Sequence, residues 1–194
     1  VRIYKDAKAI GTAAAALFAA QVIVKPNSVL GLATGSSPIP TYQKMAEVYR
    51  EGAVDFSGVT TFNLDEYVGL DHDHDQSYYY FMMENLFKHI NVPHDRIHVL
   101  SGTAANVEDE CRHYEEMIEA AGGIDLQILG IGRNGHIAFN EPADAFAPTT
   151  HIVELTESTI EANKRFFASA DDVPRRALTM GIGSIMKARS IVII

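Results

Sequence analysis

The alternation of short apolar runs with longer helix-forming stretches limits this chain to few folds. Largely apolar runs at 29–33, 126–129 and 190–194 have the length of buried strands, and amphipathic or alanine-rich stretches separate them. Strands of a parallel sheet form near-continuous apolar runs, because helices cover both faces of such a sheet. The pattern therefore predicts an α/β fold: an open, mainly parallel, twisted sheet with helices on both faces, a three-layer Rossmann-like architecture.

We expect a single domain over residues 1–194, since this length buries a sizeable core and no linker or repeat interrupts the chain. The predicted helices cover residues 6–24, 38–50, 76–88 (capped by Asp75), 108–121 and 158–167, and the further strands cover 59–63, 97–100, 151–155 and 177–181. The first helix is apolar, but it is shorter than the roughly 20 residues of a membrane span and contains Gln21. We therefore predict a core helix.

Charge and cysteine content exclude some classes of partner. The formal net charge is −9, which argues against nonspecific binding to nucleic acid or to anionic membranes. An anionic small molecule must then be held by a local site. Cys111 is the single cysteine, so no internal disulfide can form, which is typical of a cytoplasmic protein.

A glycine-rich loop at 130–142 follows the apolar run 126–129 and carries His136 and Glu141. Its glycines allow sharp turns and a close approach to the backbone. A histidine beside an acid that orients it can move protons near neutral pH. The alternative is a structural glycine turn with a satisfied histidine.

A second candidate follows the predicted strand 59–63, which leads into Asp65 and Glu66. In open α/β sheets, ligands bind outside the carboxyl ends of the strands, so Asp65 and His136 are expected in one crevice. The alternative is a solvated turn or a helix cap.

The loop before the second helix suggests a phosphate site. Backbone amides at a helix N-terminus and neighbouring hydroxyl groups form a natural cradle for an anion, and Pro38 suits the first helical position. The alternative is an ordinary capped helix start. The candidate residues are Thr34, Gly35, Ser36 and Ser37.

Residues 61–70 (TFNLDEYVGL) and 132–142 (GRNGHIAFNEP) both resemble signatures of the glucosamine-6-phosphate deaminase family, and they stand in the right order and separation. The similarity extends from Ile3 to the end of the chain. The resemblance implies conversion of glucosamine 6-phosphate and water to fructose 6-phosphate and ammonia in amino-sugar catabolism. The enzyme would act as an aldose–ketose isomerase and hydrolase, with no metal or organic cofactor.

The resemblance also implies roles for individual residues. His136 would open the sugar ring, with Glu141 and Asn134 orienting its imidazole, and Asp65 would move the C2 proton to C1. Asn134 stands where some relatives carry an aspartate, which leaves Glu141 to supply the negative charge. The phosphate would lie against the Thr34–Ser37 loop, Gly130 and Arg165, although Arg165 alone could equally be a surface helix residue.

Three further expectations concern regulation and alternatives. The positions that hold an allosteric effector phosphate in some relatives are Asp144, His151 and Val153, a poor anion site, so we predict no effector site; the oligomeric state stays open. The acidic and histidine-rich stretch 71–75 lacks a second ligand pair, so we predict no metal site there. A 6-phosphogluconolactonase or a non-catalytic sugar-phosphate sensor are the competing functions.

The apolar strand predicted at 190–194 should lead into a loop at the edge of the sheet that carries Asp65 and His136. In the family, that loop supplies a lysine for the sugar phosphate and continues into a helix. We therefore expect the native polypeptide to continue for a few dozen residues.

Overall fold

A parallel sheet forms the centre of the molecule, as predicted. The computed structural model describes residues 1–194 except 133, 165–166, 168 and 170–171. Within these residues the main sheet has five strands in the order β4-β2-β1-β5-β8, all parallel to their neighbours. The strands are β1 (Val29–Leu32), β2 (Thr60–Asn63), β4 (Ile97–His98), β5 (Leu126–Leu129) and β8 (Ser190–Ile193).

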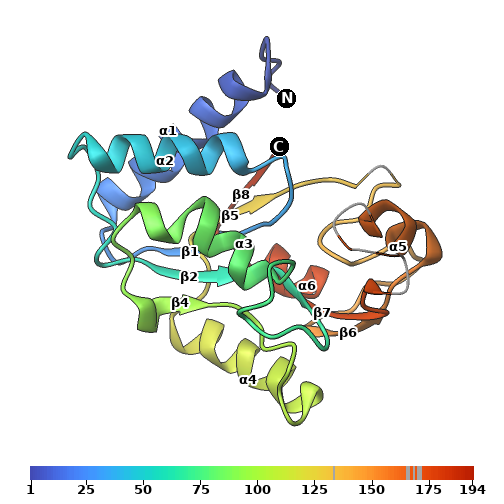
Figure 1. Cartoon of the computed structure of the whole chain (residues 1–194). Coiled ribbons are helices and arrows are strands. Elements are labelled where there is room, and N and C mark those ends of the chain that lie inside the picture. Colours follow the sequence, from blue (N-terminus) through green and yellow to red (C-terminus); the bar gives the residue numbers. More distant parts are fainter. Residues whose placement is uncertain (133, 165–166, 168, 170–171) are drawn as a thin grey trace.

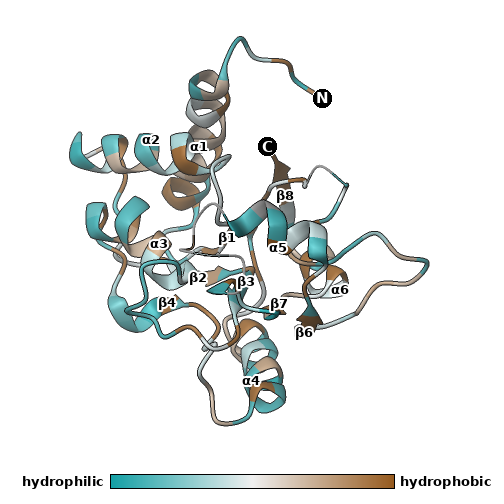
Figure 2. Ribbon diagram, turned by 45° about the vertical axis from the view of Figure 1, so that its right-hand side comes forward, coloured by the Kyte–Doolittle hydropathy of each residue, from teal (hydrophilic) through white to brown (hydrophobic). Residues whose placement is uncertain are grey.

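Helices cover both faces of this sheet (Figure 1), which confirms the predicted α/β architecture. α1 (Ala7–Val24), α2 (Ile39–Arg50) and α3 (Tyr78–Asn85) lie on one side, and α4 (Val107–Ala120) lies on the other. Tyr114 of α4 packs edge-on against Phe62 of β2, and both side chains are fully buried. Figure 2 shows α4 with a hydrophobic side and a hydrophilic side, as expected for a helix that covers a core.

α1 is long and apolar enough to cross a membrane by length and composition, with a mean hydropathy of 1.7, and 28% of it is buried. It packs on α2, where a Cβ on Gly11 would overlap Pro40. Phe18 and Val22 enter the core, while Leu17 is exposed. The predicted core helix is therefore a helix that buries one face only.

A second, smaller sheet was not predicted. Within the described part of the chain it has three antiparallel strands in the order β3-β7-β6, namely β3 (Asp65–Tyr67), β6 (His151–Glu154) and β7 (Arg176–Thr179). The short helices α5 (Glu157–Asn163) and α6 (Ile182–Met186) flank it (Figure 1). The strands predicted at 151–155 and 177–181 are present as β6 and β7, and they belong to this second sheet.

Several predicted boundaries also need correction. α3 is capped by Ser77, whose hydroxyl accepts from Tyr80 N, and not by Asp75. α3 ends at Asn85 and is followed by 3₁₀ turns at Phe87–His89 and His94–Arg96. Pro38 is the N-cap of α2 and not its first residue. α5 spans Glu157–Asn163, a shorter stretch than the predicted 158–167.

A cluster of charged side chains around the buried Asp125 lies at the amino ends of the strands. Asp125, only 4% exposed, accepts from Lys25 Nζ at 2.7 Å, from Val29 N at 2.8 Å and from Arg189 Nη1 at 2.5 Å. Burial alone would raise the pKa of Asp125, but these hydrogen bonds together lower it. The cluster ties β1, β5 and β8 together at the edge opposite the candidate site.

Candidate active site

The carboxyl ends of three neighbouring strands form the candidate site. β1 lies between β2 and β5, and the chain leaves β1 toward β2 but later returns to its other side as β5. Parallel strands place their following loops at one edge, and such a reversal of strand order is where open α/β sheets bind ligands. Thr34–Ser37 follow β1, Asp65 follows β2 as the first residue of β3, and His136 lies in the loop after β5, so the predicted residues share this edge.

Asp65 lies where the chain passes from one sheet to the other. Leu64 N donates to Leu32 O of β1 at 3.1 Å, and Leu64 O accepts from Met180 N at 2.7 Å. Asp65 therefore begins β3 instead of ending the preceding strand. It is 6% exposed, and burial, with the neighbouring Glu66 charge as a second cause, raises its pKa to about 8. A carboxyl group with a pKa near neutrality can both accept and return a proton.

Glu66 is a fully buried carboxylate whose hydrogen-bond partners are backbone N–H groups. Its oxygens accept from the backbone N–H groups of Tyr67 at 2.8 Å and of Tyr78 and Tyr79 at 3.0 Å. The last two groups open α3, where a negative charge is stabilised by the helix dipole. Burial raises the pKa of Glu66 to about 7, against the lowering effect of these hydrogen bonds. Glu66 thus fixes α3 and places a second acid beside Asp65.

The glycine-rich loop folds back so that His136 lies over Gly132. Gly132 N donates to His136 O at 2.9 Å, and a Cβ on Gly132 would overlap the imidazole ring. Gly135 has φ 89°, a conformation that favours glycine. The imidazole is about 30% exposed. The two glycines therefore permit the turn that presents His136 at the site.

Glu141 and Asn134 lie beside His136. Asn134 Nδ2 donates to Glu141 Oε2, and Asn134 Oδ1 accepts from His136 N at 3.2 Å. Glu141 Oε1 lies 3.9 Å from His136 Nδ1, which is within ion-pair range but beyond a hydrogen bond. Asn134 therefore links the acid to the backbone of the histidine.

Strand β7 holds the two halves of the site together. Thr179 pairs with Asp65 across the small sheet, and its Oγ1 accepts from Phe139 N at 3.1 Å. Asn140 Nδ2 donates to Met180 O at 2.9 Å. β7 thus fastens the His136 loop beside Asp65. Sequence reasoning missed Thr179, because no local pattern marks a strand residue that acts through tertiary pairing.

The predicted phosphate loop has an open helix N-terminus. Among the described residues, no side chain caps α2, because Pro38 occupies the N-cap. Gly35 has φ 95°, and Gly35, Ser36 and Ser37 are exposed. Gly130, at the end of β5, has open space where a Cβ would stand. Arg165 lies outside the described residues.

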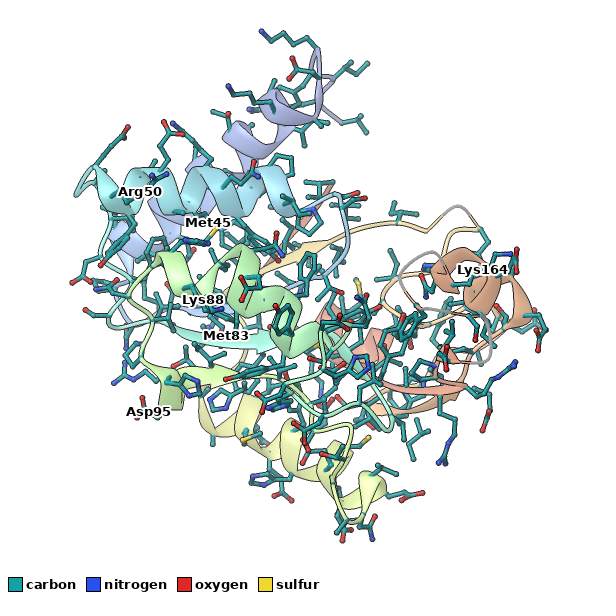
Figure 3. The ribbon with its side chains drawn as sticks, viewed as in Figure 1. Met45, Arg50, Met83, Lys88, Asp95 and Lys164 are labelled. Carbon is teal, nitrogen blue, oxygen red and sulfur yellow. The ribbon has the colours of Figure 1, made fainter. Side chains whose placement is uncertain are left out.

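A cavity of about 290 Å³ opens beside Glu141 and Phe139 and is also lined by His151 and Val153. A larger cavity of about 620 Å³ lies between α2 and α3 and contains none of the predicted site residues. Arg50 and Lys88 line it, and Figure 3 shows both far from Lys164 at the end of α5. No group of three His, Cys, Asp or Glu side chains is placed to hold a metal ion in the part of the chain that the structure describes.

Comparison with known proteins gives close relatives. A glucosamine-6-phosphate deaminase from Thermoanaerobacter sp. is 60% identical over 181 residues, covering 93% of this chain and 72% of that protein. One from Halothermothrix orenii is 57% identical over 194 residues, covering all of this chain and 80% of that protein.

Solved structures with the same fold include a protein of the same name as these relatives. A monomeric glucosamine-6-phosphate deaminase superimposes with a TM-score of 0.95 at 42% identity, covering 98% of this chain and 79% of that one. A 6-phosphogluconolactonase from Leishmania guyanensis, with a TM-score of 0.76 and 18% identity over 99% of this chain and 79% of its own, shares the fold. Residues 5–194 match the family described as glucosamine-6-phosphate isomerases/6-phosphogluconolactonase. The chain therefore belongs to this family.

Proposed function

We propose that this protein is a glucosamine-6-phosphate deaminase, which converts glucosamine 6-phosphate and water to fructose 6-phosphate and ammonia. The observation that carries the proposal is the placement of Asp65 beside the His136 loop, with Thr179 of β7 fastening both. Two separate proton-transfer groups suit an aldose–ketose isomerisation. One group moves the proton that opens the sugar ring, and the other moves a proton from C2 to C1. Relatives at 57% to 60% identity that carry this name support the choice of substrate.

The first task is to hold the phosphate. The backbone N–H groups of the exposed residues Gly35, Ser36 and Ser37, with the two serine hydroxyls, bind the dianion where this loop leads into α2, and no side-chain cap of α2 competes with it. Gly130 leaves room for the sugar to approach the end of β5. These contacts orient the sugar along the carboxyl edge of the sheet, with its C1 and C2 toward Asp65 and His136.

The chemistry then follows in three steps. His136 moves the proton of the anomeric hydroxyl to the ring oxygen, which opens the pyranose. Asp65, in its ionised form, removes the proton from C2 and returns it to C1, while the C1 oxygen of the open-chain aldehyde takes up a proton lost by the C2 ammonium group. The C1 carbon thereby becomes a hydroxymethyl group, and the nitrogen becomes an iminium at C2. Water adds to C2 and ammonia leaves, which gives the ketose. The net reaction is a hydrolytic deamination: the oxygen of the water becomes the C2 carbonyl oxygen, and both of its protons leave with the nitrogen as ammonium.

Ammonia release from glucosamine 6-phosphate by the purified protein tests the proposal, with fructose 6-phosphate measured in the same sample. We expect the two products in equal amounts. Release of acid from 6-phosphogluconolactone, without ammonia from the amino sugar, would instead assign the chain to the lactonase branch of the fold. Binding of the sugar phosphate with neither activity would indicate a sensor.

A further inference from the structure

The carboxylate of Glu141 has more partners than the proposed chemistry requires. Its Oε1 accepts from Thr159 Oγ1 at 3.1 Å and from Thr156 Oγ1 at 3.5 Å, while Asn134 holds Oε2. His136 Nδ1 lies 3.9 Å from the same Oε1, and this buried nitrogen has no hydrogen-bond partner among the described residues. Thr159 therefore occupies the oxygen that His136 would use.

Thr159 lies in the first turn of α5, an element that supplies no residue to the proposed reaction. It is 8% exposed, and its N–H donates to Thr156 O at 2.9 Å. The two threonine hydroxyls are 3.0 Å apart. A β-branched side chain in a helix has few rotamers, so the Thr159 hydroxyl is well fixed. Its position then depends on how α5 packs.

On the basis of the proposed function, we infer that Thr159 is a positioning residue: its hydroxyl holds Oε1 of Glu141 and thereby sets how the His136 imidazole is oriented and protonated. A carboxylate gripped at one oxygen by Asn134 and at the other by Thr159 cannot turn freely. The carboxylate therefore transmits the position of α5 to the imidazole. With Thr159 bound, Oε1 stays beyond hydrogen-bond distance of Nδ1.

Other ionisable groups around this loop are already engaged or come from other elements. Glu157 of α5 is paired with Arg175, and Glu161 with Lys164. Among the described residues, Asp65 belongs to β3, and His151 and Glu154 line the cavity beside Glu141. Glu141 is thus the acid within ion-pair range of His136 in the described structure.

The test follows the ring resonance of His136 by NMR as pH is varied, with the resonance assigned by its loss in His136→Gln. In Thr159→Val, which keeps the shape but removes the hydroxyl, Oε1 loses its shorter hydrogen bond and keeps only the 3.5 Å contact with Thr156, so it can move to accept from Nδ1 of the protonated ring. The midpoint of the His136 titration should move to higher pH by about half a unit. Thr159→Ser keeps the hydroxyl and should leave the midpoint in place.

Dependence on Glu141 is tested by repeating Thr159→Val in a Glu141→Gln background, where the shift should vanish. In kinetics, Thr159→Val should lower kcat roughly tenfold with KM nearly constant, because orientation rather than binding is lost. An unchanged midpoint, or an equal shift in the Glu141→Gln background, would overturn the inference. The titration needs no substrate, so a protein that shows the coupling but releases no ammonia would refute the proposed function alone.

Discussion

Replacing Asp65 by asparagine should abolish turnover and stabilise the fold at the same time. Asp65 is 6% exposed, and its pKa is raised from 3.8 to about 8. Asparagine has nearly the same shape but no charge to desolvate. If Asp65 carries the C2 proton, Asp65→Asn should lower kcat by roughly 10³-fold or more with a small change in KM, because the lost interaction belongs to the transition state.

The gain in stability follows from the direction of the pKa shift. An unfolded chain ionises this carboxyl above 3.8, whereas the folded protein keeps it protonated up to about 8. Its contribution to stability is therefore complete below 3.8 and is lost as pH rises toward 8. The loss amounts to at most about 1.4 kcal/mol per pH unit, or roughly 2–3 kcal/mol between about pH 5 and about pH 7. Asp65→Asn has no carboxyl group at this position, so its stability does not decrease with pH for this reason.

Urea unfolding measures the difference. The chain has no tryptophan, so far-ultraviolet circular dichroism is the suitable probe. The free energy of unfolding of Asp65→Asn, relative to the unmodified protein, should increase between about pH 5 and about pH 7 by up to the amount above. Glu66 titrates in both proteins, so its contribution largely cancels.

Asp125→Asn is the matched control, because Asp125 is also buried but has a lowered pKa. Its contribution to stability is present above 3.8 and lost only as pH falls through a lower value. This variant should be less stable than the unmodified protein by a constant amount over the same pH range. A relative stability of Asp65→Asn that does not change with pH, or near-native turnover, would refute the reasoning for Asp65.

The remaining predictions concern the same edge of the sheet. First, kcat/KM should rise with pH through a value of about 8, because Asp65 acts as a base only when ionised; in Glu66→Gln this limb should move to lower pH, since a like charge is removed, and an unmoved limb would argue against Asp65 as the base. Second, Gly132→Ala should lower kcat by roughly 10²-fold, because the new methyl group overlaps the His136 ring; a far-ultraviolet spectrum like that of the unmodified protein would show that the fold survives, and near-native kcat would contradict the placement of the ring. Third, rate curves should be hyperbolic and insensitive to N-acetylglucosamine 6-phosphate; a sigmoidal curve that this compound straightens would contradict the predicted lack of an effector site.

Three strands of the main sheet, β1, β5 and β8, could be predicted because each is a largely apolar run with its own local signal. β5 occupies residues Leu126–Leu129, as the sequence predicted. The small sheet could not be predicted in the same way. β3 consists of Asp65, Glu66 and Tyr67, which is not a strand-forming pattern, and its pairing with β7 joins residues far apart in the sequence. Whether such residues form a strand depends on tertiary contacts and not on the local sequence.

The candidate site could likewise be predicted only in part. Residues that stand directly after apolar runs, such as Asp65 and the His136 loop, could be placed at one edge by the rule for parallel strands. Thr179 and Thr159 could not, because a threonine carries no local sign of the loop that it will bind. The resemblance implied that Glu141 orients the His136 imidazole. In the structure, Glu141 Oε1 lies 3.9 Å from His136 Nδ1 and accepts a hydrogen bond from Thr159 Oγ1.

The fate of the hydrogen at C2 tests the account most directly. Glucosamine 6-phosphate deuterated at C2 is incubated with the protein, and ammonia and the phosphorylated sugar are collected. Removal of the C2 proton by Asp65 predicts fructose 6-phosphate with deuterium at C1 or released to water, and turnover slowed by the deuterium. A phosphorylated aldose that keeps deuterium at C2 while ammonia is released would contradict the account, because nitrogen would then have been replaced without any transfer between C2 and C1.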